Sequence, residues 1–318
     1  MASYVIRRLL QAILVIIVVS ILVFVLMRLL PGDPIEMLIS SSMLTDFTPE
    51  MMDALRHEKG LDKPIAEQYF QWLGQMLKGD FGNSIMQNYN ISDEIKDRVV
   101  VTMLIGFIAW LIGLVVGVLL GIICAIRRGK LVDNIVSVIA NIGLTSPQFW
   151  IAILLVYFFV MKAKLLPLYG YTLPWVNFRQ SVRQSIMPIM VTALSPIATT
   201  ARQTRSSVLE VLNEDYVRTA WSKGLNERKV VIKHVLKNAL MPVVTLQGTM
   251  LRMIIGGSVV VETIFVIPGM GSMLTNSMLS HDYPVVQAIT VIMTAVVVLS
   301  NLLVDILYAW IDPRIQYS

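Results

Sequence analysis

The residue types that usually carry catalysis or bind metals are sparse in this sequence and lie far apart. The histidines are His57, His234 and His281, the single cysteine is Cys124, and no CxxC or HExxH pattern occurs. Zinc sites and metalloproteases need such close spacings. The segment 256–260 (GGSVV) offers a serine without a neighbouring base, which argues against an intramembrane protease. We therefore expect no protein metal site, no bound cofactor and no catalytic centre.

Two charged residues, Arg252 and Glu262, interrupt an otherwise apolar stretch from 239 to 265. A lipid-facing charge at that depth costs about 2.5–3.5 kcal/mol on insertion scales, so we expect Arg252 to face protein or water. Ten residues rise about 15 Å along a helix, too far for a direct pair with Glu262. Arg252 then either pairs with a neighbouring span or with backbone carbonyls, or has a functional role in which its planar fork binds a carboxylate.

The composition predicts a polytopic membrane protein. Of the 318 residues 56% are hydrophobic, the mean hydropathy is +0.70, and 15% are charged, against about 25% in soluble proteins. The net charge of +5 could suggest nucleic acid, but in a membrane protein such an excess collects in cytoplasmic loops beside anionic lipid. We expect membrane lipid as a partner and no nucleic acid.

Apolar stretches predict about six transmembrane helices in an all-α integral membrane protein, because roughly 20 apolar residues span a bilayer as a helix. These stretches are Leu9–Met27, Val99–Ile126, Asn134–Met161, Gln184–Ala201, Ala239–Phe265 and Tyr283–Val304. The first is longer than a signal-peptide core and ends in RLLPGDP, so we expect it to remain as a span. Prolines 147, 188 and 196 lie inside two spans, as packing kinks or as breaks beside a water-lined path.

The distribution of lysine and arginine predicts cytoplasmic termini, since the segments then inside carry more of them than the much longer outside segments. The organisation is a first transmembrane helix (1–30), an extracytoplasmic loop with amphipathic helices (31–98) and a five-helix core (99–318) with a cytoplasmic loop at 202–237. In the outer loop, Thr48 and Pro49 predict one helix start and Pro64 another. The second helix carries an apolar stripe, for packing onto the spans or lipid or as a platform for an external partner.

The segment 214–234 (EDYVRTAWSKGLNERKVVIKH) is the most informative polar region. Asn213 can cap a helix whose first turn is acidic, Gly224 offers a left-handed stop, and Asn226 starts a second, basic helix. A solvated loop near anionic lipid would have such lysines. It would not need the apolar side chains Tyr216, Ala220 and Trp221, which favour docking into a partner's groove.

The run EDYVRTAWSKG resembles the EAA loop of permease subunits of binding-protein-dependent ABC importers. Arg218, Thr219 and Ala220 take the EAA places and Gly224 the glycine, with Val231, Leu236 and Lys237 at the later signature positions. The arginine and the final lysine depart from the oldest signature and resemble the peptide and nickel branch. Further stretches resemble that branch: PGDP (31–34), GLDKP (60–64), GDFGNS (79–84), PQFW (147–150), TRSSVLEVLNEDY (204–216), ETIFVIPGMG (262–271), HDYPVVQ (281–287) and DPRI (312–315).

The resemblance implies half of an importer in a bacterial or archaeal cytoplasmic (inner) membrane. Its partners would be a second homologous permease in a heterodimer, an extracytoplasmic substrate-binding protein and two cytoplasmic ATPases, which bind ATP and magnesium. This chain has no GxxxxGK[ST] motif of its own and is expected not to be an enzyme. The coupling helix would lie within 213–224, and the expected ATPase-docking residues are Glu214, Asp215, Tyr216, Arg218, Thr219, Ala220, Lys223 and Gly224.

Peptides are the cargo that the resemblance favours, with nickel chelates and glutathione-like molecules as alternatives within the branch. An ion-coupled secondary transporter is the rival from another class, because such proteins use acids and broken helices at the midplane. Only Glu262 offers such an acid, and it lies near the end of its span. The possible translocation path is assigned to Arg252 and Glu262.

Overall fold

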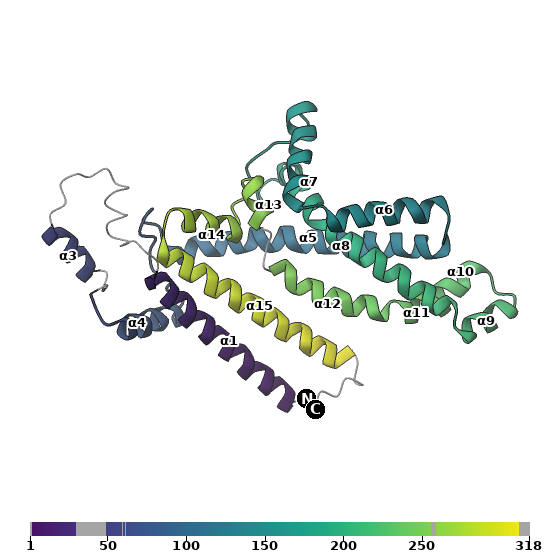
Figure 1. Cartoon of the computed structure of the whole chain (residues 1–318), viewed down its shortest axis with the longest axis horizontal. Helices are drawn as coiled ribbons and strands as arrows, with labels where there is room; N and C mark the ends of the chain where they lie inside the picture. Colours follow the sequence, from purple (N-terminus) through teal and green to yellow (C-terminus); the bar gives the residue numbers. More distant parts are fainter. Residues whose placement is uncertain (1, 30–48, 59, 61, 256–258, 312–318) are drawn as a thin grey trace. The chain divides into compact units, whose positions relative to one another are not determined.

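The structure is a computed structural model that describes residues 2–29, 49–58, 60, 62–255 and 259–311 (Figure 1). The described part is helical, which confirms the predicted all-α fold class. The chain divides into two compact units, each described here by itself. Unit 1 comprises residues 1–102, 268–309 and 313–318, and unit 2 comprises residues 103–267 and 310–312.

Unit 1 is built from both ends of the chain. Its helices are α1 (Ala2–Leu29), α3 (Pro49–Glu58), α4 (Ile65–Leu77), the first turns of α5 (Ile91–Ile126), α14 (Met270–Leu279) and α15 (Tyr283–Ile311). Its core joins Ile91 and Ile95 of α5 to α14 and α15, where Val285 and Ile289 are fully buried. The amide of Met270 donates to Thr102 Oγ1 at 2.9 Å, so α14 begins against α5.

The second helix of the outer loop begins after Pro64, as predicted, and packs on the end of α1. The Ser20 and Tyr69 hydroxyls lie 2.9 Å apart, and Phe24 is buried against the rings of Tyr69 and Trp72. The predicted packing of the apolar stripe onto a span is therefore confirmed for its central aromatic residues. Helix α3 begins at Pro49, as predicted, whereas Thr48 lies outside the described residues.

A buried carboxylate links the loop before α5 to the start of α15. Asp282 accepts hydrogen bonds from the Ser84 hydroxyl at 2.5 Å and from the Ile85 amide at 3.2 Å, and Ser84 and Asp282 are each 2% exposed. Two of the motif stretches, 79–84 and 281–287, thus meet in space. Sequence reasoning singled out both stretches but did not connect them.

Unit 2 contains the remaining helices. They are α6 (Leu131–Thr145), α7 (Gln148–Leu155), the π-helix η1 (Val156–Lys162), α8 (Phe178–Leu212), α9 (Asp215–Ser222), α10 (Glu227–Val230), the π-helix η2 (Val231–Val235), α11 (Leu236–Ala239), α12 (Met241–Ile255) and α13 (Val259–Ile264), with the rest of α5. Helix α6 packs along α8, as Figure 1 shows, and α13 packs against α7 and α8.

Helices α5 and α8 approach closely along a row of glycines. A Cβ atom at Gly113, Gly117 or Gly121 would lie only 2.4–2.6 Å from a side-chain atom of Pro196, Thr200 or Thr204, respectively. The four-residue spacing of small residues is the pattern by which membrane helices pack closely. Sequence reasoning missed it, although the G-x3-G-x3-G pattern is visible in the chain.

The predicted span Asn134–Met161 is interrupted at Ser146 and Pro147, one of the positions where the sequence predicted a kink or a break. Helix α6 ends at Thr145, and the following helical stretch 148–162 leaves at 107° to it. Proline has no amide hydrogen and restricts the residue before it to extended backbone, and Ser146 has ψ 133°. Pro188 and Pro196, by contrast, remain inside the continuous helix α8.

Among the described residues, three helices have the length and apolar composition of a membrane span: α1, α5 and α15. The bent pair of α6 with α7 and η1 brings the number to four if it counts as one crossing. The two other predicted spans correspond to α8 and to α12 with α13. Among the described residues, these helices do not have the length and apolar composition of a span. Helix α8 carries polar residues along its 35-residue length, so its burial depends on packing against α5, α6 and α12.

Candidate functional site: the α9 loop

The loop between α8 and α12 begins differently from the prediction. We expected Asn213 to cap α9, but it follows the last residue of α8, and its side-chain amide donates to the Leu209 carbonyl at 3.0 Å. Glu214 holds the N-cap position of α9 without a side-chain cap hydrogen bond. Asp215 still supplies the acid in the first turn, where its negative charge interacts favourably with the positive end of the helix dipole.

One side of α9 is anchored in the core of unit 2. Val217 is 0% and Ala220 is 5% exposed, and both belong to a buried apolar cluster. The other members of that cluster are Ala125, Val208, Val230, Val235 and Ala239, from α5, α8, α10, η2 and α11. Ala220, expected among the docking residues, instead faces this cluster, so its small size serves packing within the chain.

The other side of α9 is open. The side chains of Tyr216 and Trp221 are 42% and 41% exposed, and Arg218 is exposed between them, with one nitrogen 3.4 Å from Asp215. The Tyr216 hydroxyl accepts a hydrogen bond from the Asn238 side-chain amide at 2.8 Å, which fixes the phenol ring. Aromatic and arginine side chains are the residues most enriched in binding hot spots. We call Tyr216, Arg218 and Trp221 the outer face of α9.

The remaining expected docking residues surround this outer face. Glu214, Thr219, Lys223 and Gly224 are all exposed, and the Thr219 hydroxyl donates to the Asp215 carbonyl at 2.9 Å. The predicted left-handed stop is confirmed at Gly224, which has φ +72°. The predicted restart is also confirmed, because the Asn226 side chain accepts from the Lys229 amide at 2.9 Å.

We expect Gly224→Val to leave membrane insertion intact but to reduce transport. A β-branched residue at this positive φ costs roughly 1–3 kcal/mol, although a Cβ atom would meet nothing within 4 Å. The strain would displace the end of α9. Transport by the assembled complex measures the effect, with Gly79→Val as the control, since Gly79 has φ +82° and equally open surroundings in unit 1. Equal losses from both variants would contradict a special role of the α9 loop.

An ion pair that sequence reasoning missed joins α8, the helix from which this loop extends, to α6. Arg205 of α8 donates from Nε and Nη2 to the two carboxylate oxygens of Asp133 at 2.7 and 2.8 Å, and the Gly129 amide adds a third bond at 2.9 Å. Asp133 is 2% exposed. The bidentate geometry fixes the first turn of α6 against α8. No local signal could reveal it, because the partners are 72 residues apart.

Of the two residues assigned to a possible translocation path, the structure describes the side chain of Glu262 but not that of Arg252. Arg252 lies in α12, but its side chain lies outside the described residues. Glu262 lies on α13 and is 3% exposed, so its side chain is enclosed by other described residues. In the described part of the chain, no group of three or more His, Cys, Asp or Glu side chains could hold a metal ion.

Comparison with known protein families gives two matches that together cover nearly the whole chain. Residues 117–317 match the model of the binding-protein-dependent transport system inner membrane component. Residues 1–106 match the model of the N-terminal part of the same membrane component.

Individual proteins agree with these matches. The oligopeptide transport system permease protein AppB of Bacillus subtilis (strain 168) is 38% identical over 324 residues, covering all of both chains. A solved structure titled as an inward-facing conformation of the MetNI methionine ABC transporter is similar with a TM-score of 0.54, covering 69% of this chain and 96% of that one at 18% identity. An amino acid ABC transporter solved with histidines gives 0.53, covering 70% and 95% at 14% identity. At such identities the structures show the fold alone.

Proposed function

The chain belongs to the family of binding-protein-dependent transport system inner membrane components, and we propose that it forms half of the membrane path of an ATP-driven peptide importer. The observation that carries this proposal is the α9 loop, which is anchored by Val217 and Ala220 and presents two aromatic residues and an arginine outward. A rigid short helix in that position can transmit a movement of a bound partner to α8 and α12. The partners are two cytoplasmic ATPase subunits, which bind ATP and magnesium.

Peptide cargo is supported by the full-length similarity to the oligopeptide permease protein of Bacillus subtilis. The rest of the assembly is a second, homologous permease subunit, forming a heterodimer, and an extracytoplasmic substrate-binding protein. Nickel chelates and glutathione-like molecules are the alternative cargo. An ion-coupled carrier is the alternative of a different class, for which the buried Glu262 is the one described feature in favour.

Uptake into vesicles tests the proposal. The chain, its permease partner, the ATPase subunits and the binding protein are reconstituted together, and entry of a labelled tripeptide is measured with and without ATP. We expect uptake only with ATP and binding protein. Uptake by this chain alone, driven by a proton or sodium gradient, would overturn the ATP-driven mechanism, and ATP-driven uptake of a nickel chelate but not of peptides would overturn the cargo.

We propose that both termini are cytoplasmic, which puts α4 outside and α9 inside. Single cysteines at Gln87 and Ser222 in a Cys124→Ala background test this, because both positions are exposed, whereas Ser84 is buried against Asp282. An impermeant maleimide added to intact cells should label Gln87→Cys within minutes. Ser222→Cys should react only after the membrane is opened. The reverse pattern would invert the topology.

We propose that Arg252 lines the translocation path and meets anionic groups of the cargo, with Glu262 close to the same path. Arg252→Gln should then leave assembly and thermal stability unchanged and lower uptake of an acidic peptide more than that of a neutral one, because a guanidinium binds a carboxylate in two places. Uptake of two tripeptides that differ only in one glutamate or glutamine measures this. A loss of stability with equal losses for both peptides would make Arg252 structural.

A further inference from the structure

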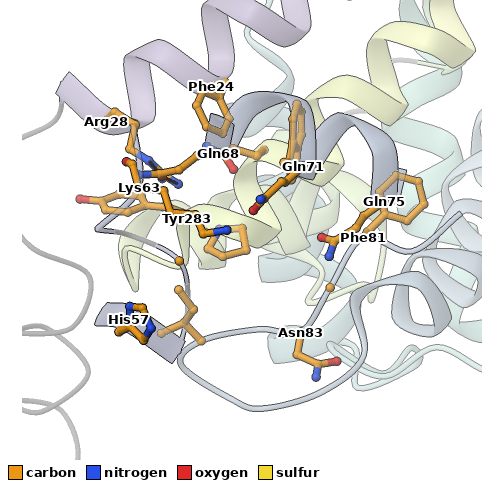
Figure 2. A pocket seen from close by; sticks show the side chains of 16 residues that line it. Phe24, Arg28, His57, Lys63, Gln68, Gln71, Gln75, Phe81, Asn83 and Tyr283 are labelled. Atoms are coloured by element: carbon orange, nitrogen blue, oxygen red, sulfur yellow. Dashed lines mark hydrogen bonds between the residues drawn. The ribbon is translucent and has the colours of Figure 1, made fainter. Parts of the chain in front are cut away.

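Unit 1 contains a cavity of about 440 Å³ that the proposed function does not use. Its walls come from the end of α1, from α3 and α4, from the loop before α5 and from the first turns of α15. Figure 2 shows Phe24, Arg28, Lys63 and Tyr283 directed toward this space. The volume lies within the range of pockets that bind small molecules or head groups.

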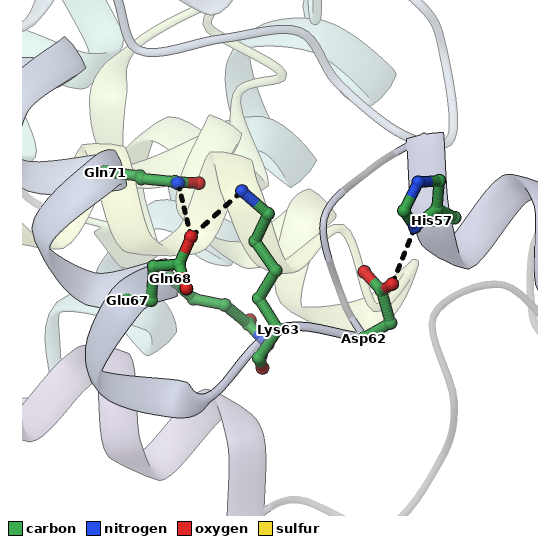
Figure 3. Close-up of polar contacts among 6 residues, drawn as sticks. All are labelled: His57, Asp62, Lys63, Glu67, Gln68 and Gln71. Atoms are coloured by element: carbon green, nitrogen blue, oxygen red, sulfur yellow. Dashed lines mark hydrogen bonds and ion pairs between the residues drawn. The ribbon is translucent and has the colours of Figure 1, made fainter.

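Among the described residues that line the cavity, the charged side chains are Arg28 and Lys63, and both are basic. His57 also lines it, and no carboxylate is among these described lining residues. Two of these residues have a carboxylate close by. Lys63 lies 3.0 Å from Glu67, and His57 lies 2.7 Å from Asp62 (Figure 3).

Arg28 is held by a neutral group. Its Nε and Nη2 atoms donate to Oε1 of Gln68 at 3.0 and 2.9 Å, and its guanidinium lies 4.8 Å from the centre of the Phe24 ring. These contacts orient the guanidinium without neutralising its charge. The cavity therefore offers a fixed positive charge that suits an anionic group.

Two buried polar atoms in the wall lack hydrogen-bond partners among the residues that the structure describes. They are the hydroxyl of Tyr283 and the side-chain nitrogen of Gln287, in residues that are 4% and 3% exposed. A buried donor left unsatisfied is costly, and nearly all such groups in folded proteins have a partner. Both atoms can donate and both residues line the cavity, so a small turn of either side chain would bring a donor to a ligand that accepts hydrogen bonds.

The cavity lies where a membrane span ends. Arg28 is in the last turn of α1, whose segment Ile6–Leu29 has the length and composition of a span. Leu26 and Leu29, beside Arg28, are 54% and 73% exposed, as expected for side chains facing lipid tails. Trp72, in the cavity wall, is of the type that gathers at the level of lipid head groups.

We propose that this cavity binds the phosphate of an anionic phospholipid head group, in the leaflet that faces α4. Arg28 supplies the positive charge, the hydroxyl of Tyr283 and the side-chain amide of Gln287 supply neutral donors, and the acyl chains lie along the exposed apolar side of α1. The proposal requires that α1 spans the membrane, and it does not depend on the cargo or on the ATPase partners.

Binding is tested on the full chain purified in a neutral detergent. Phosphatidylglycerol, phosphatidylcholine or inorganic phosphate is added, and retained lipid is counted by native mass spectrometry while the thermal unfolding midpoint is recorded. We expect phosphatidylglycerol alone to be retained and to raise the midpoint by about 4 °C or more at saturation. Arg28→Gln should weaken its binding by about tenfold or more, since a hydrogen-bonded charge is lost. Arg7→Gln is the matched control at the other end of α1, where Arg7 is exposed and away from the cavity.

Gln287→Leu separates a ligand site from an empty cavity. Without lipid, the variant should be as stable as the parent or more stable, because an unsatisfied buried donor is removed. With phosphatidylglycerol, its rise in unfolding midpoint should be smaller than that of the parent. An equal rise for parent and variant would overturn the proposal. So would an equal effect of phosphatidylcholine or of inorganic phosphate, or an equal loss of lipid binding in Arg7→Gln.

Discussion

Gly117→Ala is expected to lower the free energy of unfolding by roughly 3 kcal/mol, at the upper end for an overpacked core. The added Cβ atom would lie 2.6 Å from Cβ of Thr200 and 2.9 Å from the carbonyl oxygen of Ile197. A main-chain atom cannot rotate away, so relief requires α5 and α8 to separate. The double variant Gly117→Ala/Gly121→Ala should lose more, because the second Cβ would meet the Ala201 carbonyl oxygen at 2.6 Å. Thermal and denaturant unfolding in detergent measure both.

Gly143→Ala is the matched control, and its effect should have the opposite sign. Gly143 also lies in a helix of unit 2, but a Cβ atom there would meet its nearest neighbour, the Leu194 carbonyl oxygen, at an ordinary 3.8 Å. Alanine then brings only its helix propensity, worth up to about 1 kcal/mol over glycine. If Gly117→Ala proved as stable as Gly143→Ala, the close approach of α5 and α8 would be refuted.

Trp221→Ala is expected to abolish most ATP-driven uptake while the chain still folds and inserts. The indole is 41% exposed on the outer face of α9, so its removal costs little in folding. As the largest apolar group on the proposed ATPase-docking surface, it should act as a hot spot worth about 2 kcal/mol or more, so its loss should weaken docking roughly thirtyfold. Co-purification of the ATPase subunits and uptake into vesicles measure the loss.

Two further variants separate docking from folding. Trp175→Ala removes another exposed tryptophan, from the loop before α8, and should leave ATPase binding unchanged. Val217→Ala removes a fully buried side chain on the opposite side of α9 and should lower thermal stability. If Trp221→Ala lost stability as Val217→Ala does but kept its ATPase, the outer face of α9 would not be the docking surface.

Features set by local pattern were predictable from the sequence. Helices α1, α5 and α15 correspond to long uncharged runs, and the starts after Pro64 and Asn226 and the stop at Gly224 follow from rules about single residues. The orientation, the docking residues and the role of Arg252 remain predictions.

Features set by packing between distant segments could not be predicted from local sequence patterns. The Asp133–Arg205 pair and the Ser84–Asp282 bond join residues that only the fold brings together. Asn213 can cap α9, but α8 extends to Leu212 and leaves Asn213 at its end. Ala220 fits a docking helix by type, yet α9 buries that side against Val208. The sequence alone did not decide between a kink and a break at Pro147, because a proline in an apolar run can bend a helix or end it.

The bond between Ser84 and Asp282 has a consequence for biosynthesis. Its partners are 198 residues apart, and α15, which contributes three of the seven buried residues in the core around Ile91, follows Asp282 directly. Contacts between such distant segments form late, because the intervening chain must be made first. As the chain emerges from the ribosome, α4 can settle on α1 early, whereas Ile91, Ile95 and the loop before them stay uncovered until nearly all of the protein has been synthesised. A nascent chain stalled before residue 282 would therefore be accessible to proteases and chaperones at 79–95. Once α15 is complete, it covers Ile91 and Ile95 and ends this exposure.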